Sequence, residues 1–94
     1  MTDAETLYTA MHPTRLEILA RVAIKSTYAT ALEDEIGIDR KIVAFHLAVL
    51  EKAGLVSSKF GLKNEPQTRP VAVKYYELTT KGKDAFERAK KALK

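Results

Sequence analysis

The spacing of hydrophobic residues divides the 94-residue chain into seven elements. Residues 55–60 and 71–78 are rich in β-branched and aromatic side chains, which favours two strands that pair as a hairpin. Helical spacing predicts one helix over residues 4–11, a second that begins at Pro13, a short third that ends at Gly37, a fourth over residues 40–53 and a last one over residues 80–93. The predicted fold is therefore mainly α with a small β-hairpin, in the order ααααββα.

The apolar faces of the helices predict which residues form the core. Placing residues ~100° apart around the axis of the fourth helix gathers Val43, Leu47 and Leu50 into one buried stripe. Asp39 is well placed to cap this helix, and Gly37 to end the third one. The face that the second helix is expected to bury consists of Leu16, Leu19, Ala20 and Ala23.

The opposite face of the fourth helix is basic and sterically open. The ten residues between the two strands, 61–70, exceed a tight turn and carry Lys63 and Arg69, so a basic protrusion is expected there. The formal charge is −2 over residues 1–47 and +6 over residues 48–94, which indicates a surface for a polyanion, nucleic acid first. The outward residues of the fourth helix, with two neighbours on one shoulder, are Lys41, Phe45, Ala48, Lys52, Arg40 and Ala44.

Three motifs within residues 32–56 carry a resemblance to a known family. They are G-I-D at the turn, V-x-x-H-L-x-x-L in the helix that follows, and E-K-A-G-L-V at the entry to the first strand. In this order they resemble the winged helix-turn-helix of the arsenic-repressor-like class of bacterial and archaeal transcription regulators. Residues 12–19 and 76–82 extend the likeness to nearly the whole chain. The resemblance implies one winged-helix domain over residues 1–94, with the helix-turn-helix at about 29–53, the wing at about 55–78 and dimerisation helices at about 4–11 and 80–93.

The resemblance also implies a transcription regulator that binds double-stranded DNA. The helix over residues 40–53 is then the recognition helix, and its N-terminal part enters the major groove. Arg40 can read guanine, while Lys41 and the free backbone amides at the helix start more often take phosphates. With the wing beside the DNA backbone, the expected DNA-binding residues are Arg40, Lys41, Ala44, Phe45, Ala48, Lys52, Lys59, Lys63, Arg69 and Lys74.

Phe45 is the most informative exposed residue of the recognition helix. Its ring can contact thymine methyl groups, fold back beneath the wing or meet a protein partner. The third role belongs to an alternative function, in which the chain is a winged-helix interaction module that holds another protein through Phe45 and the wing without sequence-specific DNA binding.

Apolar residues on the terminal helices exceed what a small core needs. Together with the resemblance, this excess predicts a homodimer, whose two recognition helices would lie about 34 Å apart on a palindromic site. The residues expected in the dimer interface are Leu7, Met11, Phe86, Ala89 and Leu93.

The composition speaks against several other kinds of chemistry. The chain has no cysteine, and His12 and His46 belong to different helices that give no reason to pair them, so neither a metal site nor a cofactor is expected. Glu33, Asp34 and Glu35 point in different directions on a helix, and no glycine-rich phosphate loop is present, so no enzyme is expected. With no membrane span of ~18 apolar residues, the expected location is the cytoplasm, and a small-molecule effector is left open.

Overall fold

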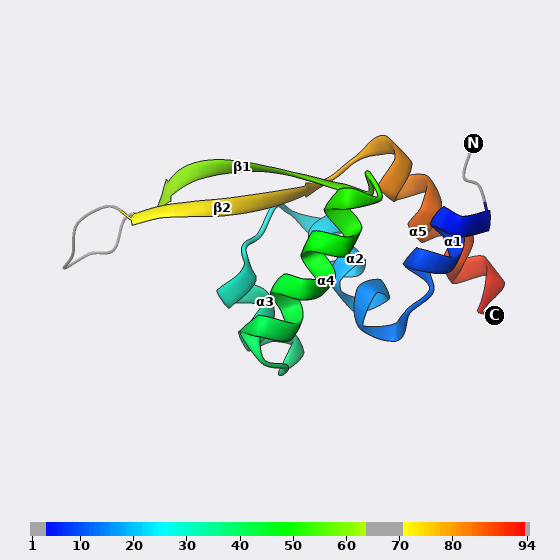
Figure 1. Cartoon of the computed structure of the whole chain (residues 1–94), viewed down its shortest axis with the longest axis horizontal. Coiled ribbons are helices and arrows are strands. Elements are labelled where there is room, and N and C mark those ends of the chain that lie inside the picture. Colours follow the sequence, from blue (N-terminus) through cyan, green and yellow to red (C-terminus); the bar gives the residue numbers. More distant parts are fainter. Residues whose placement is uncertain (1–3, 64–70, 94) are drawn as a thin grey trace.

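The computed structural model describes residues 4–63 and 71–93, and within them the elements follow the predicted order (Figure 1). The helices are α1 (Ala4–Ala10), α2 (Pro13–Ile24), α3 (Ala29–Ile36), α4 (Arg40–Lys52) and α5 (Thr80–Ala92), and the strands are β1 (Val56–Lys63) and β2 (Val71–Leu78). The predicted fold class, mainly α with a β-hairpin in the order ααααββα, is confirmed. No helix in these two ranges is long and apolar enough to cross a membrane.

Local signals fix the ends of the helices that form the helix-turn-helix. Gly37 has a φ of 83° and ends α3 in the left-handed conformation, and Gly54 does the same after α4 with a φ of 82°. The Asp39 carboxylate accepts a hydrogen bond from the Lys41 backbone N–H, which caps α4 as predicted. The turn between the two helices is therefore set by residues 37–39.

The core lies between α2, α4, α5 and the root of the hairpin. Val43, Leu47 and Leu50 are fully buried, which confirms the stripe predicted for α4. The face predicted for α2 is wrong at Ala23, which is exposed. The large side chains bury more apolar area than alanine, so the helix turns them inward; the buried residues of α2 are Ile18, Leu19 and Val22.

The wing is a longer hairpin than the sequence predicts. The antiparallel register runs from Val56 opposite Leu78 to Lys63 opposite Val71, so β1 continues three residues beyond Phe60 and the predicted loop over residues 61–70 begins too early. A Cβ atom at Gly61 would lie 3.1 Å from the Tyr75 ring, so the glycine leaves room for this ring across the hairpin. Residues 64–70 lie outside the described part of the chain.

The two ends of the molecule carry different elements. Figure 1 shows the wing extending at one end, α1 and α5 together at the other, and α3 and α4 between them. A short backbone bridge between Thr27 and Tyr76 ties the chain before α3 to the base of β2. The recognition helix and the wing are thus held to one rigid base, away from the terminal helices.

Candidate nucleic-acid interface

The outward face of α4 forms the centre of the candidate interface. Phe45 is 60% exposed, which excludes the possibility that its ring folds back beneath the wing. The ring instead makes an edge contact with His46, with centroids 5.3 Å apart. The structure leaves exposed all six residues predicted for this face: Arg40, Lys41, Ala44, Phe45, Ala48 and Lys52.

Carboxylates occupy the backbone amides at the start of α4. The Arg40 N–H donates to Glu33 Oε2 at 2.9 Å, and the Lys41 N–H donates to Asp39 Oδ1 at 3.2 Å. The Ile42 N–H donates to the Asp39 carbonyl oxygen. The expectation that these amides are free to take phosphates is therefore wrong, and the cationic side chains of Arg40 and Lys41 are the groups at this helix end that can meet DNA.

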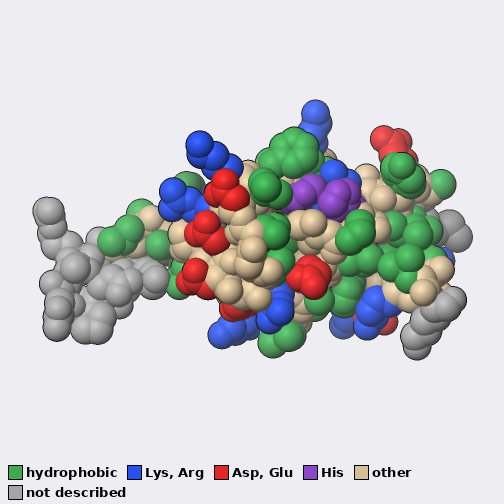
Figure 2. Space-filling model, turned by 90° about the horizontal axis from the view of Figure 1, so that it is seen from below, with side chains coloured by type: hydrophobic (Ala, Val, Ile, Leu, Met, Phe, Trp, Pro, Cys, Tyr) green, Lys and Arg blue, Asp and Glu red, His purple; other side chains and the backbone are tan. Residues whose placement is uncertain are grey.

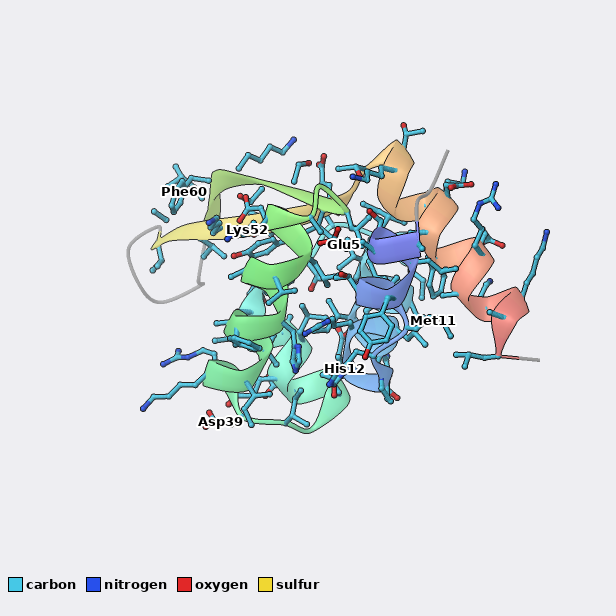
Figure 3. All side chains as sticks on the ribbon, turned by 45° about the vertical axis from the view of Figure 1, so that its right-hand side comes forward. Glu5, Met11, His12, Asp39, Lys52 and Phe60 are labelled. Atoms are coloured by element: carbon cyan, nitrogen blue, oxygen red, sulfur yellow. The ribbon has the colours of Figure 1, made fainter. Side chains whose placement is uncertain are left out.

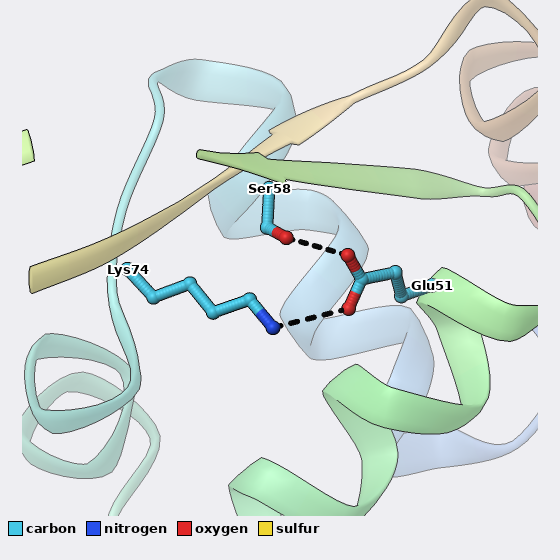
Figure 4. Close-up of polar contacts among 3 residues, drawn as sticks. All are labelled: Glu51, Ser58 and Lys74. Atoms are coloured by element: carbon cyan, nitrogen blue, oxygen red, sulfur yellow. Dashed lines mark hydrogen bonds and ion pairs between the residues drawn. The ribbon is translucent and has the colours of Figure 1, made fainter. Parts of the chain in front are cut away.

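Two lysines predicted to lie along DNA are engaged within the wing and its base. Lys59 Nζ lies 3.2 Å from Glu77 Oε1. Lys74 Nζ lies 3.5 Å from Glu51 Oε1, and the same carboxylate accepts a hydrogen bond from Ser58 (Figure 4). The prediction of free wing cations is thus corrected for Lys59 and Lys74, whose charges are already partnered.

The remaining basic residues predicted for the wing are not placed by the structure. Arg69 lies outside the described residues, and of Lys63 only the backbone, at the end of β1, belongs to them. A cleft of about 400 Å³ opens between the start of α3, the N-terminal end of α4 and β2. Its lining includes Thr30, Arg40 and Lys74, so the three elements share one concave surface.

Behind this surface, a polar cluster joins α1, α2 and α4. Arg15 Nε donates to His46 Nδ1 at 3.1 Å, and Arg15 Nη1 donates to the Thr9 carbonyl oxygen at 3.2 Å. The expectation that His12 and His46 do not meet is wrong, because their ring centroids are 4.7 Å apart, and Figure 2 shows both rings side by side at the surface. Burial, followed by the charges of His12 and Arg15, lowers the pKa of His46 from its ordinary 6.5.

The terminal helices use part of their apolar surface within the chain. Ala89 is fully buried in the core, so its predicted place in a dimer interface is wrong. Leu7, Met11 and Phe86 are partly buried and pack against the same core. Leu93 is 58% exposed at the end of α5.

The geometry agrees with comparisons with known proteins. A sequence model described as bacterial regulatory protein, arsR family, matches residues 12–58, which contain the whole helix-turn-helix and half of the chain. The chain belongs to the arsR family of bacterial regulatory proteins. It is a DNA-binding transcription regulator, and this membership favours DNA binding over the interaction module.

Solved structures agree with the family. The transcriptional repressor BigR from Xylella fastidiosa is similar with a TM-score of 0.69 and 25% identity, over 87% of this chain and 74% of that one. A possible transcriptional regulator for arsenical resistance has the same fold, with a TM-score of 0.68 and 21% identity over 97% of this chain and 85% of that one. None of the curated proteins matches the chain.

The residues present do not fit a metal centre of the kind an arsenical-resistance regulator suggests. The chain has no cysteine, and no group of three histidine or carboxylate side chains within residues 4–63 and 71–93 could hold a metal ion. In the histidine pair, each Nδ1 already accepts a hydrogen bond, His12 from the Thr14 N–H and His46 from Arg15. A neutral ring that accepts at Nδ1 carries its proton on Nε2, so neither nitrogen offers a free lone pair.

Sequence reasoning missed three residues of this arsR-family protein. Glu33 was assigned to a solvated acidic face, yet it caps α4. Arg15 lies in the second helix with no motif to mark its contact with His46, 31 residues away. Tyr8, 81% exposed beside Met11, adds to the apolar surface of the terminal helices.

Proposed function

We propose that this regulator inserts the N-terminal half of α4 into the major groove of double-stranded DNA. The observation that carries the proposal is the outward face of α4, which is open, basic at its leading end and free of contacts with the wing. Arg40 suits guanine, because a guanidinium can donate two hydrogen bonds to its O6 and N7 atoms. Lys41, beside it, suits a phosphate.

The middle of this face supports a different kind of contact. Ala44, Phe45 and Ala48 present apolar groups between the basic residues, and apolar side chains recognise the methyl group of thymine. Hydrogen-bonded base reading is then concentrated in Arg40, with modest specificity overall.

We further infer that the regulator acts on DNA in the cytoplasm as a homodimer, through the end formed by α1 and α5. Leu7, Met11, Phe86 and Leu93 keep apolar surface there, and Tyr8 adds to it. A twofold dimer suits a palindromic site. Catalysis is not part of the proposal: Glu33, Asp34 and Glu35 diverge, with Glu33 on α4 and Glu35 3.9 Å from Arg21.

Paired charge-removing variants test the proposal. Arg40→Ala with Lys41→Ala should weaken binding to a duplex selected from a random library by ~5–150-fold, because one base contact and one phosphate contact are lost per subunit. Lys41→Ala alone should weaken all sequences alike and flatten the plot of log affinity against log salt by ~1 per subunit. Both quantities follow from fluorescence anisotropy of a labelled duplex.

The matched control removes two positive charges from α5. Lys83→Ala with Lys91→Ala changes exposed lysines at a distance from the recognition helix, so it should leave affinity within about threefold of wild type. Equal losses in both double variants would mean that diffuse charge binds DNA, and the recognition-helix assignment would be withdrawn.

A further inference from the structure

One face of the wing carries exposed apolar side chains that no other part of the fold uses. The register places Phe60 opposite Lys74 and Leu62 opposite Ala72. Because side chains alternate between the faces of a strand, Ser58, Phe60 and Leu62 share one face of β1. Phe60 is 74% exposed and Leu62 is 69% exposed.

Contacts at the base of the wing show which way this face points. Ser58 and Lys74 belong to the same face, and both contact Glu51 near the C-terminal end of α4. Figure 3 shows Phe60 on the side of the molecule where Lys52 projects from α4. The apolar face of the wing therefore continues the surface of the recognition helix.

The chemistry of this face does not match a phosphate backbone. The lysines with described side chains on the wing, Lys59 and Lys74, are paired with Glu77 and Glu51, so little free positive charge remains there. Phe60, Leu62 and Ala72 instead offer an apolar ridge next to a basic helix. A DNA duplex that receives α4 in its major groove brings its adjacent minor groove, which has apolar sugar walls, toward the hairpin. Phenylalanine and leucine are among the side chains that proteins insert between base steps in the minor groove.

We propose that Phe60 and Leu62 form a wedge that enters the minor groove next to the α4 site. The proposal rests on the proposed function, because it needs α4 in the major groove. It assigns the wing an apolar role with little salt dependence, while Arg40 and Lys41 supply the electrostatic part of binding.

Two synthetic duplexes isolate the minor groove. Poly(dI-dC) and poly(dG-dC) present the same groups in the major groove, but only guanine places an amino group in the minor groove, where it obstructs an inserted side chain. Wild-type protein should bind poly(dI-dC) about tenfold more tightly than poly(dG-dC). Phe60→Ser with Leu62→Ser should abolish this preference and leave the salt slope on both polymers unchanged.

Val71 supplies the matched control. It is an apolar residue, 51% exposed, and it lies on the opposite face of the same hairpin, opposite Lys63. Val71→Ser should keep the preference for poly(dI-dC). Equal affinity of the wild type for both polymers, or a preference that survives in the Phe60 and Leu62 variant, would overturn the wedge and indicate that the face serves a protein partner or none. Absence of binding to either polymer would instead overturn the proposed function itself.

Discussion

At the scale of single residues, His46 links the recognition helix to the rest of the fold. It is 7% exposed and accepts a hydrogen bond from Arg15, a side chain that can only donate. A proton on His46 Nδ1 would break this bond and place a positive charge against the guanidinium. The neutral imidazole is therefore the form that the folded state favours, in agreement with its lowered pKa.

This arrangement predicts how stability depends on pH. Above the ordinary pKa of 6.5, His46 is neutral in both the folded and the unfolded chain and contributes no pH dependence. As the pH falls below 6.5, the unfolded chain takes up a proton that the folded chain resists, so the free energy of unfolding falls by no more than ~1.4 kcal/mol per pH unit from this group. The fall stops below the folded pKa, where both states are protonated.

His46→Gln isolates this contribution, because its amide oxygen can still accept from Arg15 while the side chain no longer titrates. Urea unfolding between about pH 5 and 7.5 should show a shallower pH dependence for the variant than for the wild type. Parallel curves for the two proteins would show that His46 is not held neutral by the fold.

The residue scale is also where the sequence predicts least. Asp39 could be identified as a cap because it directly precedes a helix with apolar periodicity. Glu33 could not, since its contact with the Arg40 amide depends on the angle between two helices. The meeting of His12, Arg15 and His46 likewise depends on how α2 crosses α4, which periodicity does not determine.

At the scale of elements, the junction between the wing and α5 is packed through a glycine. A Cβ atom at Gly82 would lie 1.9 Å from the Leu55 carbonyl oxygen, so the first turn of α5 lies directly against the backbone that leads into β1. The Thr79 hydroxyl holds the same junction by accepting from the Gly82 N–H and donating to the Gly54 and Leu55 carbonyl oxygens.

Gly82→Ala should therefore destabilise the protein, by at least ~1–3 kcal/mol, because the added methyl group meets backbone that cannot turn aside. Lys83→Ala, an exposed change in the same turn, should stay within about 0.5 kcal/mol of wild type. Urea denaturation measures both. An alanine at position 82 that leaves the midpoint unchanged would mean that α5 is free to shift away from Leu55.

The order and ends of the elements follow from signals in the sequence, but their faces and lengths follow only in part. The stripe of α4 was predictable because its apolar residues are large and its outer face is charged or small. The face of α2 was not, since apolar residues surround much of this helix and packing chooses Ile18 and Val22 over Ala23. The extra residues of β1 depend on the register across Gly61, which a single strand does not reveal.

At the scale of the whole molecule, the terminal helices lie at the end opposite to the wing, which separates the proposed dimer contact from the DNA contact. Leu93→Asp should weaken self-association by about tenfold or more, because it places a charge in an apolar contact while leaving the core untouched. Sedimentation equilibrium at micromolar concentrations measures this change.

Leu62→Asp provides the control, since it introduces the same charge at an exposed leucine of the wing and should leave the dimer intact. A wild-type chain that sediments as a monomer, both free and on DNA, would remove the dimer from the account. Loss of the dimer in both variants would assign the contact to other residues.

Selection of DNA from a random library by the purified protein tests the central claim, that α4 reads the major groove, most directly. The wild-type protein should retain an inverted repeat whose half-sites are centred ~10–10.5 base pairs apart, one turn of the duplex. Arg40→Ala should retain the same repeat with selection relaxed at one position of each half-site, because only the contact with one base is lost. Retention of unrelated sequences by the wild type, or an identical selection by Arg40→Ala, would contradict the claim.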